Sequence, residues 1–310
     1  MDKVAIIILN WNSYRYTYDC LKSLEGLSYK DFKVFLVDNN SADNSFQNLK
    51  MDYETNIFSS DIEFIQTGSN LGFAGGNNVG VKLAKKQHFK YVWLLNNDTT
   101  VHKDSLHYLL NTINSGNKTG IVGSKIYYYD TDLIWFAGGR LNEYTGNAWH
   151  VGIREKDNER FNQLKEVDYI TGCSLLFKMD LVDSIGYMME DYFLYYEETD
   201  WNLKAASKGW KIVYVPESIV YHKVSVSSGG EKNIAPYVDY YYLRNAYIMI
   251  KRNGTLFKRL TAFINLLYKF LKKHIKIIIR NLDRKSERRL YLYLSLKDAL
   301  AEKMGKHPDI

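Results

Sequence analysis

The sequence predicts an α/β fold around a mostly parallel sheet, and two observations lead to that prediction. In the first hundred residues, short apolar runs alternate with stretches of helical periodicity, which is the pattern of βαβ units. The apolar runs are continuous, as in VAIIIL at residues 4–9, because strands of a parallel sheet are buried on both faces. With 46% hydrophobic and 25% charged residues among 310, the composition is that of a globular protein.

The predicted elements follow one another in order along the chain. Strands are expected at residues 4–9, 32–37, 62–66 and 92–95, with helices between them. Beyond residue 120 the alternation weakens, and we expect shorter strands that complete the sheet and build a second pocket. After Gly254 the sequence is helical to its end. We therefore divide the chain into a first half of about residues 1–120, a second half of about 121–250, and a helical tail of 251–310.

Two of the predicted strands end in polar side chains that a buried strand does not need. The second runs into Asp38, and the fourth runs into Asn96-Asn97-Asp98. Ligands of such sheets lie beyond the carboxyl ends of the strands. Asp98 is therefore a candidate ligand of Mg²⁺ or Mn²⁺, completed by waters and phosphate oxygens, unless it only caps a helix. Asp38 could accept a hydrogen bond from a pyrimidine N3–H or a ribose hydroxyl, or form an Asx turn.

A nucleotide would also need a stacking surface and backbone amides for its phosphates. Trp11, just past the first strand, could stack on a nucleobase or fill the rim of the sheet. The segment GSNLGFAGGNNVG, residues 68–80, is rich in glycine, which would let N–H groups approach a pyrophosphate at a helix start. Asn70, Gly72 and Asn77 could contact the nucleotide there, or the asparagines could cap turns. The segment has neither Walker nor GxGxxG spacing, so an NAD-dependent enzyme is excluded.

The densest group of carboxylates lies in GYMMEDYFLYYEETDWNLKAASKGW, residues 186–210. Aromatic residues are interleaved with these carboxylates, which are therefore partly desolvated and also repel one another. Both effects raise a carboxyl pKa toward the range of a general base. On a helix Glu197 and Asp200 share a face, whereas Glu198 points about 100° away from Glu197, so the three need not share a role. The clustered acids are Glu190, Asp191, Glu197, Glu198 and Asp200.

A histidine completes the set of candidate site residues. His222 follows a predicted strand and precedes a Ser/Gly-rich loop, in VYHKVSVSSGG. We interpret it as a ligand of a metal ion or a pyrophosphate, with a purely structural role as the alternative. The loop beside it could order over a bound phosphate.

Taken together and in order, these motifs resemble those of the inverting GT-A glycosyltransferases of family 2, especially their bacterial rhamnosyltransferase-like branch. The resemblance covers roughly residues 3–250. It implies a GT-A fold, in which a Rossmann-like, mostly parallel sheet with flanking helices has a nucleotide-binding half and an acceptor half. The motifs are NWN, VDNNSADNS, GSNLGFAGGNN, LLNNDT, TGCSLLFK, FLYYEETDWNLKAASKGW and HKVSVSSGG.

The resemblance implies a role for each candidate on the donor side. Trp11 and Asp38 would bind the nucleotide base. Asn96-Asn97-Asp98 takes the place of a D-x-D motif, so Asp98 would hold the cation and Asn97 would lie beside the donor. The earlier acid of that motif has been lost here, since Asn96 stands in its place. His222 matches the family's histidine and would be the second metal ligand.

The resemblance also implies a catalytic base. Glu197-Glu198-Thr199-Asp200-Trp201 takes the place of E-D-x-D-L, whose second acid is usually the base, which gives Glu198 that role. Glu replaces Asp at this position, and Lys204 stands where the family usually has Arg. Glu197 and Asp200 are the next candidates. In the implied single displacement, Glu198 deprotonates an acceptor hydroxyl that attacks the anomeric carbon opposite the leaving nucleoside diphosphate.

The branch implies rhamnose from dTDP-rhamnose as the transferred sugar, with UDP-sugars as the alternative, because both bases offer the same N3–H to Asp38. The acceptor would be a saccharide or a lipid-linked glycan of a bacterial surface polysaccharide. A non-catalytic nucleotide-sugar-binding scaffold is the competing hypothesis, against which the costly, partly buried acids argue. A processive polysaccharide synthase is disfavoured because the sequence shows no spanning helix and no Q-x-x-R-W motif.

The tail differs from the rest in charge and pattern. Residues 251–310 carry a net charge of +11 and residues 1–250 one of −5. One predicted helix gathers apolar side chains on one line and basic ones opposite, which is typical of a helix at a membrane surface. The alternative is that its apolar line packs on the catalytic domain or on a second subunit. The apolar line is Leu260, Ile264, Leu267, Leu271, Ile275 and Ile278, and the basic set is Lys258, Lys269, Lys273, Lys276 and Arg280.

The remaining expectations concern location and partners. The apolar start is too short for a signal peptide, no apolar stretch is long enough for a membrane-spanning helix, and two cysteines form no disulfide framework. We therefore expect a cytoplasmic protein at the inner face of the cell membrane. No nucleic-acid-binding motif accompanies the basic tail, so nucleic acid is not an expected partner. The oligomeric state stays open.

Overall fold

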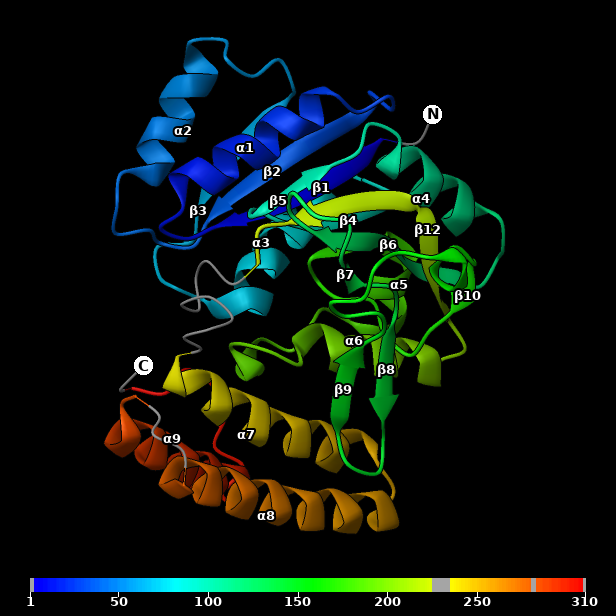
Figure 1. Ribbon diagram of the computed structural model, residues 1–310. Coiled ribbons are helices and arrows are strands. Elements are labelled where there is room, and N and C mark those ends of the chain that lie inside the picture. Colours follow the sequence, from blue (N-terminus) through cyan, green and yellow to red (C-terminus); the bar gives the residue numbers. More distant parts are fainter. Residues whose placement is uncertain (1–2, 225–234, 280–282, 309–310) are drawn as a thin grey trace.

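The computed structural model describes residues 3–224, 235–279 and 283–308. Within these ranges, ten strands form one sheet in the order β10-β12-β6-β11-β4-β1-β2-β3, with β5 on β12 and β7 on β6 (Figure 1). They are β1 (Val4–Asn10), β2 (Phe32–Asp38), β3 (Ile62–Gln66), β4 (Tyr91–Asn96), β5 (Thr99–Val101), β6 (Thr119–Tyr128), β7 (Ile134–Phe136), β10 (Lys165–Glu166), β11 (Ser174–Lys178) and β12 (Lys211–His222). A separate hairpin joins β8 (Gly139–Asn142) to β9 (Asn147–His150).

The direction of the strands confirms the predicted mostly parallel α/β fold. β3, β2, β1 and β4 run parallel, and β6 and β12 run parallel to each other. β11 lies between β4 and β6 and is antiparallel to both, so β6 and β12 point the same way as β4. The carboxyl ends of β1, β2, β4 and β12 therefore lie along one edge of the sheet. The apolar runs of these strands are almost fully buried, as continuous apolar strands require.

Helices connect the strands and cover the sheet. They are α1 (Tyr14–Glu25), α2 (Ser45–Glu54), α3 (Gly72–Lys86), α4 (Ser105–Asn114), α5 (Met179–Ile185) and α6 (Glu197–Ser207), with short 3-10 turns η1 (Glu159–Phe161) and η2 (Glu190–Tyr192). Glycines let α3 pack closely on the sheet: a Cβ at Gly80 would lie 2.7 Å from Cγ2 of Ile7. Glycine within α3 thus serves close packing between α3 and β1.

Three C-terminal helices form a second layer below the sheet (Figure 1). They are α7 (Pro236–Asn253), α8 (Leu256–Ile279) and α9 (Lys285–Leu300). An apolar cluster of their own joins them to the segment before α6, and its buried members include Tyr192, Tyr196, Leu243, Leu266 and Leu292. This layer begins at Pro236, ahead of residue 251, so α7 packs with the tail.

The predicted amphipathic helix exists as α8, and its apolar line is largely exposed. Lys258 and Lys273 of its basic set pair with Glu143 and Asp239. Arg280 and the predicted Ser/Gly-rich loop from residue 225 lie outside the described residues. Within the described ranges, none of the helices combines the length and the apolar character needed to cross a bilayer.

Candidate active site

The carboxyl ends of three strands are joined by a chain of hydrogen bonds. The register of β1 and β2 places Asn10 opposite Asp38, and Asn10 Nδ2 donates to Asp38 Oδ1 at 2.8 Å. Thr17 of α1 donates its hydroxyl to Asn10 Oδ1 at 2.7 Å and accepts from Asn97 Nδ2 at 2.8 Å. The predicted donor residues Asp38 and Asn97 thus belong to one network, which fixes the edge of the sheet before any ligand binds.

Asp38 is more enclosed than its predicted role at the base requires. Its side chain has no exposed surface. Its Oδ1 accepts from Asn10 and from the Ser41 hydroxyl at 2.6 Å, and its Oδ2 accepts from the Ser41 backbone amide at 3.0 Å. A carboxylate has about four acceptor positions, so one is left. Trp11, by contrast, is 43% exposed at the same edge, where its ring is accessible for stacking.

The glycine-rich segment makes contacts within the protein. Asn70 Oδ1 accepts from the Gly72 amide at 3.0 Å, and the Phe73 amide donates to the Phe193 carbonyl at 3.0 Å. Asn77 is buried and donates to the Phe73 carbonyl at 2.9 Å. The first two amides of α3 are therefore already bonded, which leaves less of this helix start for a pyrophosphate than the sequence indicated.

Gly72 joins this segment to the acidic motif. Its φ of +72° lies in the left-handed region, and a Cβ there would collide with the Phe193 carbonyl. Only glycine therefore fits at this position. The donor half and the acidic motif meet at this backbone contact.

Asp98 and His222, the two predicted metal ligands, are adjacent and buried. His222 Nε2 lies 3.1 Å from Asp98 Oδ1, forming an ion pair. Burial acts to raise the Asp98 pKa, but the charge and hydrogen bond of His222, a backbone hydrogen bond and the charge of Lys223 together lower it. Burial acts to lower the His222 pKa, but Asp98 and the neighbouring Cys173 raise it well above its ordinary value. Apart from this pair, neither Asp98 Oδ1 nor His222 Nδ1 has a hydrogen-bond partner among the described residues.

The chemistry of this pair fits a hard divalent cation with few protein ligands. It offers one carboxylate and one imidazole, and no group of three or more such side chains that could hold a metal ion occurs in the described part of the chain. Mg²⁺ commonly keeps waters and takes phosphate oxygens as further ligands. Binding a metal would release the imidazolium proton, because a ligating imidazole must be neutral.

The three candidate bases differ in exposure. Glu197 and Asp200 are buried, with 1% and 4% of their surface exposed, whereas Glu198 is half-buried. Burial raises the pKa of all three carboxyl groups. Glu198 adds to the rise at Glu197, and Asn253 opposes it at Asp200. Of the three, Glu198 alone combines a raised pKa with partial access to an acceptor.

Glu198 and the Asp98–His222 pair both lie close to the same two consecutive residues. The Gly172 backbone lies close enough to the Glu198 carboxylate to act on its pKa, which it lowers against the effect of burial. The next residue, Cys173, has a thiol close to both His222 and Asp98. Because consecutive Cα atoms are about 3.8 Å apart, the candidate base and the candidate cation ligands face one small region.

The segment before α6 is strained. Phe193, Tyr195 and Tyr196 have φ of 68°, 67° and 75°, a region that costs a non-glycine residue on the order of 1 kcal/mol or more. Asn245 of α7 donates to the carbonyls of Leu194 at 2.8 Å and Tyr195 at 2.9 Å. Surrounding contacts of this kind are what allow such a backbone to persist.

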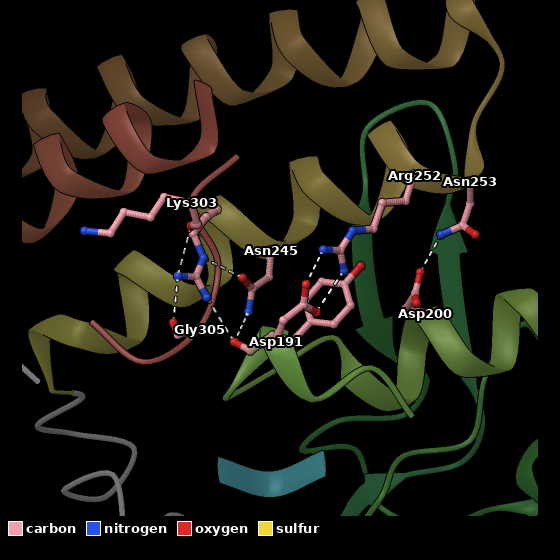
Figure 2. A network of polar contacts seen from close by, with 9 residues as sticks. Asp191, Asp200, Asn245, Arg252, Asn253, Lys303 and Gly305 are labelled. Atoms are coloured by element: carbon pink, nitrogen blue, oxygen red, sulfur yellow. Dashed lines mark hydrogen bonds and ion pairs between the residues drawn. The ribbon is translucent and has the colours of Figure 1, made fainter. Parts of the chain in front are cut away.

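Further contacts from the tail hold the same segment (Figure 2). Arg252 pairs with Asp191, and Asn253 donates to Asp200. The Gly305 amide donates to the Asp191 carbonyl at 2.6 Å. Arg244 donates to the Tyr192 carbonyl at 3.0 Å and to the Gly305 carbonyl at 3.0 Å. Together with the bonds from Asn245, these contacts link the segment before α6 to both ends of the helical layer.

Sequence reasoning did not single out several of these residues. Asn10 and Thr17 organise the sheet edge, and Asn10 stands within the NWN motif. Arg244 and Asn245 hold the segment before α6. The available signal for them was a charged and an amide side chain inside the aromatic run YYYLRNAY. Tyr242, 45% exposed with its ring 4.5 Å from that of Tyr195, adds an accessible aromatic surface near Glu198.

The comparison with protein families gives one match that covers more than half of the chain. The family model described as Glycosyl transferase family 2 matches residues 5–185. The matched region includes the donor-side network and ends just before the acidic motif.

Two curated relatives are similar in sequence. The low-salt glycan biosynthesis hexosyltransferase Agl10 of Haloferax volcanii is 26% identical over 66% of this chain and 62% of its own length. The poly-beta-1,6-N-acetyl-D-glucosamine synthase of Staphylococcus aureus is 24% identical over 74% of this chain and 52% of its own. The chain thus spans only about half to three fifths of these relatives.

Two solved structures are similar in fold. TarS 1-349 of S. aureus in complex with UDP-GlcNAc has a TM-score of 0.61 at 16% identity, covering 97% of this chain and 88% of that chain. The mannosyltransferase PcManGT of Pyrobaculum calidifontis in complex with GDP-Man and Mn²⁺ has a TM-score of 0.60 at 14% identity, covering 97% and 87%. The helical layer is included in both alignments, since nearly the whole chain is covered.

Proposed function

The chain belongs to glycosyl transferase family 2, and from that premise we propose that it is an inverting glycosyltransferase. It would move a sugar from a nucleotide donor to a hydroxyl of a saccharide or lipid-linked acceptor. The observation that carries this proposal is that Glu198 and the Asp98–His222 pair both lie close to the consecutive residues Gly172 and Cys173. A base for the acceptor and ligands for the leaving group's charge then serve one reaction centre.

In the proposed reaction, Glu198 takes the proton of the acceptor hydroxyl as that oxygen attacks the anomeric carbon. The bond to the nucleoside diphosphate breaks on the opposite face of the sugar. The raised pKa of Glu198 makes it a stronger proton acceptor than an exposed carboxylate. Asp98 and His222 would hold Mg²⁺ or Mn²⁺, whose charge would neutralise the departing diphosphate.

The donor would lie along the carboxyl edge of the sheet. Trp11 would stack on the base, and Asp38 would receive its N3–H through the acceptor position that Asn10 and Ser41 leave free. The remaining wall of the donor site would be formed by backbone that four residues hold in place. They are Asn70, Gly72, Asn77 and Asn97. We propose dTDP-rhamnose as the donor and a UDP-sugar as the second candidate, which the complex of TarS with UDP-GlcNAc favours.

The acceptor would approach Glu198 from the side of Tyr195 and Tyr242. Aromatic rings with exposed faces suit a sugar ring, which has apolar faces of its own. The names of the two curated relatives point to glycan and polysaccharide synthesis. We propose a place in bacterial surface polysaccharide synthesis, with the protein at the inner face of the cell membrane where lipid-linked acceptors are used.

A nucleotide-sugar-binding scaffold without catalysis is the competing function. The buried acids weigh against it, because burying a carboxyl group costs free energy that a binding protein has no need to spend. The unpartnered Oε1 of Glu197 is one such group among the described residues.

The test is a calorimetric and thermal-shift screen of the protein against dTDP, UDP, GDP and their sugars, with and without Mn²⁺. We expect selective binding of dTDP or dTDP-rhamnose that Mn²⁺ strengthens. Preference for UDP would transfer the proposal to UDP-sugars. Binding of the correct sugar nucleotide without any transfer to saccharide or lipid-linked acceptors would support the scaffold, and silence from every nucleotide would refute the donor site.

A further inference from the structure

The outward face of α8 is a continuous apolar stripe. Leu260, Ile264, Leu271, Ile275 and Ile278 are each between 53% and 57% exposed, and Leu256 is 84% exposed. We call this surface the α8 stripe. It consists of Leu256, Phe257, Leu260, Ile264, Tyr268, Leu271, Ile275, Ile278 and Ile279.

The stripe is distinct from the face by which α8 packs on the protein. That packing face is a different row, with Ala262, Leu266 and Ile277 as its buried members. Leu266 and Ala262 join the apolar cluster that α7 and α9 share. α8 therefore packs on the rest of the protein without burying the α8 stripe. Single exposed apolar residues are ordinary, but a contiguous row of this length marks an interaction surface.

The charge on α8 identifies the chemistry of what covers the stripe. The helix contains six Lys and Arg residues and no Asp or Glu. Lys258 and Lys273 are paired with acids of the neighbouring elements. Arg259, Lys272 and Lys276 are exposed, so cationic groups accompany the stripe along its length. An apolar row bordered by cations is complementary to a surface that is anionic outside and apolar beneath.

We propose that the α8 stripe lies in the surface of an anionic lipid bilayer, with the helix axis parallel to the membrane. A helix of 24 residues is about 36 Å long, and its apolar face would enter about 5–10 Å into the boundary between headgroups and acyl chains. A second copy of the chain fits less well, because two stripes face to face would bring their like-charged borders together.

In this proposal only one face of α8, and not the whole of residues 251–310, contacts the membrane. α7 bonds the segment before α6 and is itself bonded to α9, so both helices make their contacts within the protein. The inference does not depend on donor or acceptor chemistry, because vesicle binding needs neither. A failure of the proposed transfer reaction would therefore leave it standing.

The experiment is flotation of the full chain with vesicles of phosphatidylcholine alone and of phosphatidylcholine with phosphatidylglycerol. The stripe variant carries Leu260→Ser, Ile264→Ser, Leu271→Ser and Ile275→Ser. The matched control carries Met51→Ser, Ile153→Ser and Leu164→Ser, which remove exposed apolar side chains of similar exposure elsewhere. A charge variant carries Lys272→Glu and Lys276→Glu. Circular dichroism and donor binding report whether each variant is folded.

We expect the wild type and the control to float with the anionic vesicles and the stripe variant to lose at least tenfold in affinity. Losing a lysine near an anionic surface weakens binding about fivefold, so the charge variant should bind anionic vesicles weakly and respond little to salt. Equal binding by the stripe variant would overturn the proposal. So would a wild type that ignores both vesicles but forms a dimer that the stripe variant cannot form.

Discussion

The sheet edge that we propose binds the donor, called the donor edge below, and the segment before α6 hold their polar groups in opposite ways. At the donor edge, Asp38 has three hydrogen bonds and lies in a network that local loops complete. In the segment before α6, Phe193, Tyr195 and Tyr196 have positive φ. Glu197 has an oxygen without a hydrogen-bond partner among the described residues, and α7 supplies the contacts that hold the segment. A binding surface can rest on satisfied local bonds, whereas a reactive carboxylate needs a costly position enforced from a distance.

The largest expected effect is a loss of the rate of sugar transfer without a loss of donor affinity. Glu198→Gln should lower the rate of sugar transfer by about 10²–10⁴-fold, because general-base catalysis contributes that much. Donor affinity, measured by calorimetry, should be unchanged. Glu197→Gln is the matched control: the Glu197 pKa is raised well above its ordinary value, so the neutral amide resembles the protonated acid and transfer should stay within a few-fold. Equal losses in the two variants would contradict the assignment of the base.

Disturbing the donor edge should have a smaller effect, and on binding. Asp38→Asn replaces an acceptor by an NH₂ group that faces the donors Asn10 and Ser41. Hydrogen bonds to charged groups contribute about 1.5–3 kcal/mol each, so donor affinity should fall by about 10–100-fold. The rate at saturating donor should change little. The control is Asp52→Asn, which alters a partly buried acid of α2 bonded to Tyr14 and should leave donor affinity unchanged. An equal loss of donor affinity in both variants would contradict a specific role of Asp38.

A third variant changes a residue of α7 that holds the segment before α6. Asn245→Ala removes the donor for the Leu194 and Tyr195 carbonyls and should release the strained backbone before Glu198. We expect kcat to fall about tenfold, as about 1.4 kcal/mol of lost positioning implies, while the donor KM stays constant. Asn265→Ala removes a similar amide bond, to the Thr145 carbonyl, and should not affect kcat. A fall in kcat for both variants would mean general destabilisation.

The smallest expected effect concerns stability and pH. A carboxyl group whose pKa is raised on folding stabilises the folded state below its unfolded pKa, and that contribution is lost as pH rises through the folded pKa. Glu197 is such a group. Glu197→Gln should therefore be more stable than the wild type at alkaline pH, by about 2–4 °C in Tm for each kcal/mol. The difference should vanish at acidic pH, and a difference that grows toward acid would contradict the raised pKa.

The sequence predicted the parts of the fold that local patterns determine. Continuous apolar runs predicted a parallel sheet. The polar residues that follow the second and fourth strands led to the prediction that Asp38 and Asp98 lie at one edge, which the strand directions confirm. The insertion of β11 between β4 and β6 depends on pairing between distant segments, which no local pattern contains. The roles of Arg244 and Asn245 were missed for the same reason, since each bonds residues about fifty positions away.

The tail shows a second limit of sequence patterns. Periodicity identified the apolar line of α8, and both solvent exposure and burial were compatible with it. The helix has a second apolar row, with Ala262, Leu266 and Ile277, and this row makes the contact with the protein. Which of two apolar rows packs inward is decided by the shape of α7 and α9, which a single helix does not reveal.

The dependence of the segment before α6 on α7 and on Gly305 affects how the protein folds during its synthesis on the ribosome. Domains fold from the N-terminus as the chain emerges, so the sheet edge that would bind the donor is complete before α7, α8 and α9 have been synthesised. The Asp191 backbone is bonded by Gly305, which lies beyond all three helices in the sequence. The segment before α6 therefore gains its holding contacts late in translation, and a chain terminated before α7 would retain the sheet edge without the contacts that position Glu198.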